Sequence, residues 1–163
     1  MIGMLTGPVV ATSATDKSRI AKLLELREAI APDVAAYAAQ RATTGDLSAL
    51  ADCLKELERN EAGSQFEELN RRFHDLLGWA SGNPLFGLLT STMHLLTREF
   101  SRSLGYSAQE RAVQLRFLRR VLEAVRTGDA EAARQAMARL VGGSASYLAE
   151  RSPELVDQKV RWG

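Results

Sequence analysis

Every long segment of this 163-residue chain repeats its apolar residues with a helical period, and no segment shows a sustained alternation of β-branched residues. Short polar connections separate these segments, and several contain residues that begin or end helices. In the run SGNP at 81–84, Gly82 suits a left-handed helix end, Asn83 an N-cap and Pro84 the first helical position. The pattern predicts an all-α protein, an antiparallel bundle of about six helices in which neighbours in sequence pack as neighbours in space.

The expected helices cover residues 16–43, 45–59, 65–80, 84–104, 107–127 and 130–151. Thr44 is the expected N-cap of the second helix and Asp129 that of the sixth, which follows Gly128. Pro32 falls inside the first helix, where it removes a backbone donor and clashes with the preceding turn, so we expect a bend or a break there.

A chain of this length usually forms one domain, which buries roughly 70% of the surface of its unfolded chain. We expect that domain at 16–152, with an N-terminal arm at 1–15 and a C-terminal tail at 153–163.

The charge balance gives no electrostatic basis for nucleic-acid binding, because 21 basic and 20 acidic residues leave a net charge of +1. No apolar stretch approaches the roughly 20 residues that span a membrane. The N-terminal residues lack the order of a signal peptide, in which basic residues precede an apolar run. We expect a cytoplasmic protein without membrane contact.

Motifs of common enzyme classes are absent: the sequence contains no phosphate-binding glycine loop, HExxH, CxxC or GxSxG. With two histidines and one cysteine, the chain supplies few groups for nucleophilic catalysis. Cys53 lies among leucines and is expected to be a small buried side chain rather than a catalytic thiol. We therefore expect no enzyme; the weakest alternative is one that uses His74 as a general base.

The segment 65–80 carries the most informative pattern. At 100° per residue, its apolar side chains form one stripe: Phe66, Leu69, Phe73, Leu76, Leu77 and Ala80. Its charged residues are expected to face solvent: Glu67, Glu68, Arg71, Arg72 and Asp75. Asn70 and His74 fall on one edge of the stripe, one turn apart. Because an unpaired buried polar group costs about 1–3 kcal/mol, this pair needs partners; His74 is either a structural imidazole or one that faces a ligand.

Three runs, in order, resemble the FCD domain, the FadR C-terminal effector domain of GntR-type transcription regulators. ELNRRFHDLLGWASGNPLFGLL is similar to the part of that family with Asp-x-x-Phe-His and a turn ending in Gly-Asn. LLELREAIAPDVAAYAAQRAT resembles the family's opening helix, and VLEAVRTGDAEAARQAMARL its closing pattern. Together the runs cover about residues 20–150. The resemblance implies a helical domain that binds a small-molecule effector.

Many FCD domains hold a metal ion with one Asp and three His. The resemblance aligns these four positions with Asn70, His74, Leu118 and Leu140. A neutral asparagine is a poor ligand and leucine is none, so we expect no metal and no other cofactor, as in the acyl-CoA-sensing branch of the family. The two leucines lie among apolar neighbours and are expected to give the pocket a drier, more apolar interior.

Arg27 matches an arginine on the family's first helix that can fork onto a carboxylate. Its alternative is an exposed arginine paired with Glu28 or with a neighbouring helix. His94, between two apolar residues of the fourth helix, is a further candidate. The expected effector is acidic and partly apolar, and its expected contacts are Arg27, Asn70, His74, His94, Leu118 and Leu140.

Full-length regulators of this kind carry a winged helix-turn-helix before the FCD domain. Residues 1–15 are too short for one, although TGPVVA at 6–11 resembles the tail of a wing; a disordered arm is the alternative. We therefore expect DNA contact only through such an additional domain and not through this chain.

The family pairs through its helical domains, and the long first helix offers Leu23, Leu26 and Ile30 as a face, so we expect a homodimer. Two functions remain open: an effector-sensing domain, or a helical homodimerisation scaffold with a filled core and no effector. A cavity of a few hundred Å³ that Arg27, Asn70 and His74 reach would favour the first.

Overall fold

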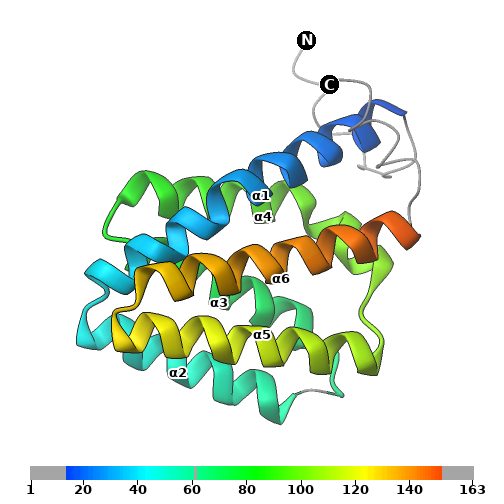
Figure 1. Cartoon of the computed structure of the whole chain (residues 1–163). Coiled ribbons are helices and arrows are strands. Elements are labelled where there is room, and N and C mark those ends of the chain that lie inside the picture. The colour runs from blue at the N-terminus through cyan, green and yellow to red at the C-terminus, as the bar shows by residue number, and fades with distance from the viewer. Residues whose placement is uncertain (1–13, 61, 152–163) are drawn as a thin grey trace.

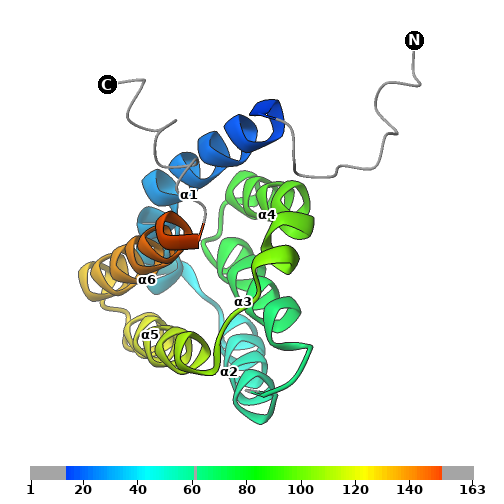
Figure 2. The same cartoon turned by 90° about the vertical axis from the view of Figure 1, so that its right-hand side faces the viewer.

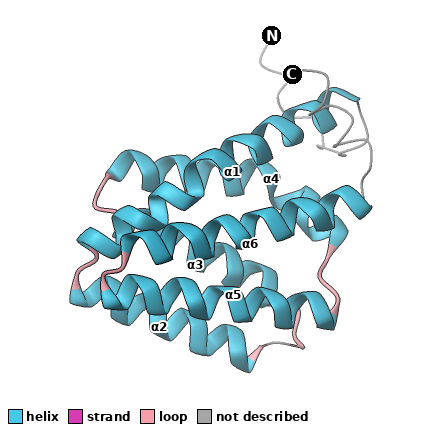
Figure 3. Ribbon diagram, viewed as in Figure 1, coloured by secondary structure: helices cyan, strands magenta, loops and turns pink. Residues whose placement is uncertain are grey.

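The structure, a computed structural model, describes residues 14–60 and 62–151. This part of the chain forms six helices and no strand, as the sequence predicts (Figures 1 and 3). The helices are α1 (Ala14–Arg41), α2 (Thr44–Arg59), α3 (Phe66–Ala80), α4 (Pro84–Leu104), α5 (Ala108–Thr127) and α6 (Ala130–Arg151). Most of the expected N-terminal arm, and the whole C-terminal tail at 153–163, lie outside the described residues.

The helix ends follow the expected chemistry with one correction. The N-cap of α2 is Thr43 and not Thr44: its hydroxyl accepts a hydrogen bond from the Asp46 amide at 3.1 Å, and the Asp46 carboxylate accepts one from the Thr43 amide at 2.9 Å. This reciprocal pair is a capping box, which satisfies two amides that the first turn leaves free. Thr44 is therefore the first helical residue.

The turn at 81–84 is confirmed residue by residue. Gly82 has a φ of 73°, Asn83 Oδ1 accepts a hydrogen bond from the Leu85 amide at 3.0 Å, and Pro84 opens α4. Asp129 caps α6 in the same way as Asn83 caps α4, by accepting from the Ala132 amide at 3.0 Å. In contrast, α1 continues through Pro32 as one helix, so the proline does not split it.

The spatial order of the helices differs from their order in the chain. Helix α1 packs mainly along α6, and also against α3, α4 and α5; α3 packs against α2 and α4, and α5 against α2 and α6. Successive helices α1 and α2, and also α4 and α5, make no extensive contact. In Figure 2, α4 and α5 lie on opposite sides of the bundle. The prediction that sequence neighbours pack together is wrong for these two pairs, because the first and last helices close the bundle against each other.

The main apolar core joins α1, α2, α3, α5 and α6, and none of its buried members comes from α4. Its largest fully buried side chains include Phe66, Phe73 and Leu118. On α4, Phe100 instead forms a small separate cluster with Ile20 and Ala21 of α1. A seam therefore runs between α4 and the main core.

Two glycines let α4 approach α3 closely at the start of this seam. A Cβ on Gly87 would lie 2.4 Å from the Trp79 ring, and one on Gly78 would lie 3.1 Å from the Thr90 hydroxyl. Any side chain at Gly87 would therefore require the Trp79 ring or the helices to move. None of the described helices combines the length and the apolar composition that crossing a membrane requires.

Replacing Leu118, which is 0% exposed, tests the main core. We expect Leu118→Ala to lower the free energy of unfolding by about 2–5 kcal/mol, because it removes buried methyl groups and leaves a cavity. Arg116→Ala, an exposed position on the same helix, should change it by less than about 0.5 kcal/mol. Urea unfolding followed by circular dichroism measures both. Equal values for the two variants would contradict this packing.

Candidate functional site

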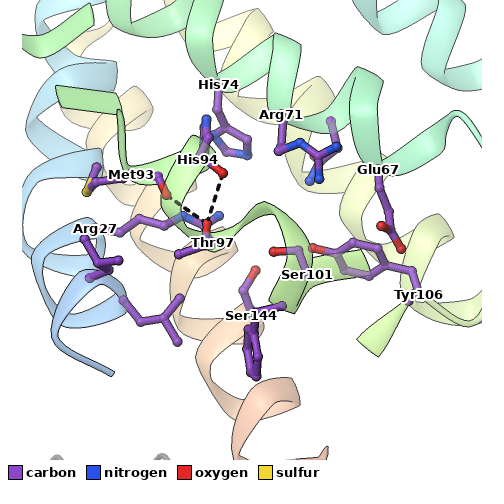
Figure 4. Close-up of a pocket in the computed structure, with 15 residues that line it drawn as sticks. Arg27, Glu67, Arg71, His74, Met93, His94, Thr97, Ser101, Tyr106 and Ser144 are labelled. Carbon is purple, nitrogen blue, oxygen red and sulfur yellow. Dashed lines mark hydrogen bonds between the residues drawn. The ribbon is translucent and has the colours of Figure 1, made fainter. Parts of the chain in front are cut away.

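A cavity of about 70 Å³ opens along the seam, with a lining drawn from α1, α3, α4, α6 and the connection before α5 (Figure 4). Four of the six predicted contact residues line it: Arg27, Asn70, His74 and His94. The structure thus brings together side chains that are up to 67 positions apart, from Arg27 to His94, at one place.

The other two predicted contacts do not line this cavity. Leu118 and Leu140 are 0% and 1% exposed and pack within the main core. Leu140 also borders a separate cavity between α5 and α6. Their prediction as interior residues is confirmed, but they do not supply apolar surface to the cavity that Arg27 reaches.

His74 is buried on α3 and its ring has neighbours on two sides. The ring centroid lies 6.2 Å from that of Phe73 and 5.8 Å from that of His94, both in edge-to-face arrangements. Nε2 is buried and has no hydrogen-bond partner among the described residues. Burial, and then the nearby Arg27 and His94, lower the pKa of His74 well below its ordinary value. His74 is therefore a neutral imidazole at pH 7, with one nitrogen unsatisfied.

His94, on α4, is held in place by a side chain of α3. Its Nδ1 lies 2.7 Å from Oδ1 of Asp75, so α3 supplies the carboxylate that orients an α4 side chain. The prediction that Asp75 is simply a solvated residue is wrong, since its partner comes from another helix. This bond fixes the ring of His94 beside that of His74.

Two arginines reach the cavity from different helices, Arg27 from α1 and Arg71 from α3 (Figure 4). Arg27 is partly buried. Burial lowers the pKa of Arg27, and electrostatic interactions with Tyr106 and Glu28 oppose that shift. Arg71 uses Nη2 to bind Glu68, while its Nη1 is buried without a partner in the described part of the chain.

Arg71 and Glu67 were expected to face solvent, and this prediction is wrong for both. They lie next to Asn70 and His74 around α3, and α4 covers that flank of the helix. Burial raises the pKa of the Glu67 carboxyl, and Arg71 opposes that shift. The cavity therefore combines basic groups with one carboxyl group that is held closer to its neutral form.

Hydroxyl groups line the rest of the cavity. The hydroxyl of Thr97 donates to the Met93 carbonyl at 2.9 Å, and that of Ser144 donates to the Leu140 carbonyl at 3.1 Å. Each keeps its oxygen lone pairs, so both can accept a further hydrogen bond. Burial raises the pKa of the Tyr106 phenol, which is therefore neutral at pH 7.

The buried Asn70 has a hydrogen-bond partner, Gln114, which the sequence analysis did not identify. Gln114 of α5 donates from Nε2 to Asn70 Oδ1 at 3.3 Å, and each of the two side chains is 6% exposed. Gln114 precedes Leu118 by one helical turn on the same side of α5. This spacing could have predicted that Gln114 faces the interior.

The donor chemistry near His74 is unlike that of a metal centre. Among residues 14–60 and 62–151, no group of three or more His, Cys, Asp or Glu side chains is placed to hold a metal ion. The side-chain oxygen of Asn70 accepts a hydrogen bond from Gln114, and the aligned Leu118 and Leu140 provide no ligand atom.

Cys53 plays no part in the cavity. Its thiol is buried and lies 3.4 Å from the Leu69 carbonyl, to which it donates. Burial raises the pKa of Cys53 to about 11, so almost no thiolate exists at neutral pH.

The buried imidazole of His74 sets a pH dependence of stability. Its pKa in the folded chain lies below the value of about 6.5 in an unfolded chain, so between those values the unfolded chain binds a proton that the folded chain does not. The free energy of unfolding should therefore fall as the pH drops below about 6.5, by at most about 1.4 kcal/mol per pH unit for this group. His74→Gln should remove this contribution. Urea titrations between about pH 7.5 and 5 measure the two slopes, and identical slopes would contradict the assignment.

Comparison with known proteins identifies the family of this helical domain. The FCD domain profile matches residues 22–143. Two similar proteins are the galactonate operon transcriptional repressor of Escherichia coli (strain K12), 28% identical over 137 residues, and the HTH-type transcriptional regulator LutR of Bacillus subtilis (strain 168), 30% identical over 142 residues. Both alignments cover 83% of this chain, but they cover only 60% and 65% of those proteins.

A solved structure, Streptococcus agalactiae GntR, shares the fold with a TM-score of 0.65 at 22% identity, over 84% of this chain and 63% of that one. The profile match covers most of the six-helix bundle, from the first turns of α1 to α6. This chain belongs to the FCD domain family.

Proposed function

We propose that this chain is the effector-sensing domain of a GntR-type transcription regulator, and that its effector is a small organic acid bound between α1, α3 and α4. One observation carries the proposal: three nitrogen groups line the same cavity, and two of them are buried without a hydrogen-bond partner among the described residues. The two unpartnered atoms are Nη1 of Arg71 and Nε2 of His74, and the third group is the partly buried guanidinium of Arg27. The two relatives described above, a transcriptional repressor and a transcriptional regulator, support the wider role.

A carboxylate is the ligand group that can accept hydrogen bonds from these nitrogen groups. Leaving a buried donor without a partner costs about 1–3 kcal/mol, and more for a charged group. A carboxylate offers acceptors for both arginines, and charge-assisted bonds of this kind are about twice as strong as neutral ones. The neutral His74 can donate to the same group from Nε2 or accept from a neighbouring hydroxyl of the ligand.

The size of the cavity bears on how the acid enters. Its volume of about 70 Å³ lies below the roughly 300–1,000 Å³ of typical ligand pockets. The cavity would have to widen along the seam, where α4 contributes no buried member to the main core. We propose that effector binding shifts α4 relative to α1, and that a winged helix-turn-helix joined ahead of α1 would follow that shift on DNA in the cytoplasm.

The alternative is a helical homodimerisation scaffold that binds no effector. The small volume of the cavity is the observation that favours it. Against it stands the convergence of Nε2 of His74 and Nη1 of Arg71, both buried without a partner among the described residues, on one cavity that Arg27 also reaches. A third alternative, an enzyme with His74 as general base, has no support from the two relatives, which are regulators.

We also propose that the domain forms a homodimer, through α4 rather than the expected face of α1. Of the α1 residues, Leu23 lines the cavity and Leu26 is only 38% exposed. Four leucines on one side of α4 are far more exposed: Leu85 (71%), Leu88 (55%), Leu95 (70%) and Leu96 (60%). A contiguous apolar face of this kind is typical of a surface that a partner covers.

Binding of acids is testable by thermal shift. In a panel of small organic acids that includes galactonate, we expect at least one to raise the melting temperature of the wild type at millimolar concentration. Arg27→Gln should lower the affinity for that acid by about 10–150-fold, the equivalent of about 1.5–3 kcal/mol for a hydrogen bond to a charged group. Arg116→Gln removes an exposed arginine away from the cavity and should respond as the wild type does. No response to any acid, or an equal response in Arg27→Gln, would refute the proposal.

The dimer is testable by sedimentation velocity at tens of micromolar. We expect the wild type to sediment as a dimer and the double variant Leu88→Lys/Leu95→Lys as a folded monomer, because buried lysines would lose their hydration. Leu26→Lys is the matched control on α1 and should remain dimeric. A monomeric wild type would contradict the dimer, and a dimeric double variant would contradict the α4 face.

A further inference from the structure

A second, larger cavity lies beside the first. It has a volume of about 290 Å³, against about 70 Å³ for the first, and lies between α5, α6 and the connection that precedes α5. Val113, Phe117, Leu140 and Gly143 form most of its apolar wall. Among the described residues, its lining contains no lysine, arginine or histidine. The first cavity, in contrast, is lined by two arginines and two histidines.

The two cavities share a wall. Tyr106 and Ser144 line both of them. A third element of the wall is the hydrogen bond between Asn70, which lines the first cavity, and Gln114, which lines the second. The ring of Tyr106, which packs edge-on against Phe66 at a centroid distance of 6.0 Å, and the side chain of Ser144 are therefore the groups that a ligand spanning both cavities would pass.

Gly143 keeps the second cavity open on its α6 side. A glycine within a helix lowers stability by about 1 kcal/mol relative to alanine. Such a glycine is usually found where a neighbouring group lies too close for a side chain. At Gly143, however, an added Cβ would meet nothing within 4 Å. The described part of the chain therefore gives no packing reason for this glycine, and its effect is to leave bare helix facing the cavity.

We propose that the two cavities are the two chambers of one ligand site, in which the acid group binds beside Arg27 and His74 and an attached hydrocarbon chain or ring passes Tyr106 into the second chamber. This inference rests on the proposed function, and it names the ligand class as a carboxylic acid with an apolar body. Neither chamber alone reaches the roughly 300–1,000 Å³ of typical ligand pockets, but together they do. The basic groups lie in the first chamber, and the second chamber, whose lining also includes Gln109, Glu110 and Gln114, supplies an apolar wall of Val113, Phe117 and Leu140 for the other end of such a molecule.

The test is isothermal titration calorimetry of the full chain with acetate, butanoate, hexanoate and octanoate. We expect the affinity of the wild type to rise about fourfold for each added methylene that enters the second chamber, which corresponds to about 0.8 kcal/mol per methylene. Arg27→Gln should weaken every acid by a similar factor, because all share the same acid-binding chamber.

Gly143→Leu should fill the second chamber, keep the affinity for acetate and butanoate, and remove the gain for hexanoate and octanoate. Gly142→Leu is the matched control: it adds the same side chain one position earlier on α6, where an added Cβ also meets nothing within 4 Å and the residue lines neither chamber. It should retain the full dependence on chain length.

The outcomes separate the two levels of the proposal. If short acids bind through Arg27 but affinity does not depend on chain length, the two-chamber site is refuted and the acid-binding function stands. The same holds if Gly143→Leu and Gly142→Leu behave alike. If none of these four acids binds, the two-chamber site is refuted, and the proposed function is then decided by the thermal-shift panel of organic acids.

Discussion

The cost of burying a hydrogen-bonding group without a partner organises the polar residues of this bundle. Some of them are paired within the fold: Gln114 satisfies the oxygen of Asn70, and Asp75 satisfies Nδ1 of His94. Others line one cavity without a partner among the described residues, namely Nη1 of Arg71 and Nε2 of His74, beside the guanidinium of Arg27. The paired groups position the cavity wall, and we propose that the unpartnered groups bind an anion.

The location of the cavity follows from how the helices divide their apolar surface. Five helices share the main core, while α4 packs on α3 at Gly78 and Gly87 and on α1 through Phe100. Where two separately packed bodies meet, side chains need not fill the seam to the density of a core. The site thus lies along the seam between α4 and the main core, which suits the α4 movement that we propose for effector binding.

The sequence predicts the helices, most of their caps and the inward placement of Asn70 and His74, because all of these depend on local periodicity and turn chemistry. The position of Thr43 was also readable, since Asp46 lies three residues after it as a capping box requires. The roles of Glu67, Arg71 and Asp75 were not readable. They follow Asn70 and His74 around α3, but their burial depends on α4 covering that flank, which is a matter of tertiary order. Leu118 and Leu140 show the converse, because apolar periodicity identifies an interior position without saying whether it faces a core or a cavity.

The most direct test of the central claim is a crystal structure of the chain with the organic acid that stabilises it most. We expect the carboxylate in the seam between α1, α3 and α4, with an oxygen at about 2.7–3.0 Å from the Arg27 guanidinium and a second hydrogen bond to Arg71 or His74. A structure in which the acid binds elsewhere, while Arg27 and His74 keep an unchanged cavity without it, would contradict the account.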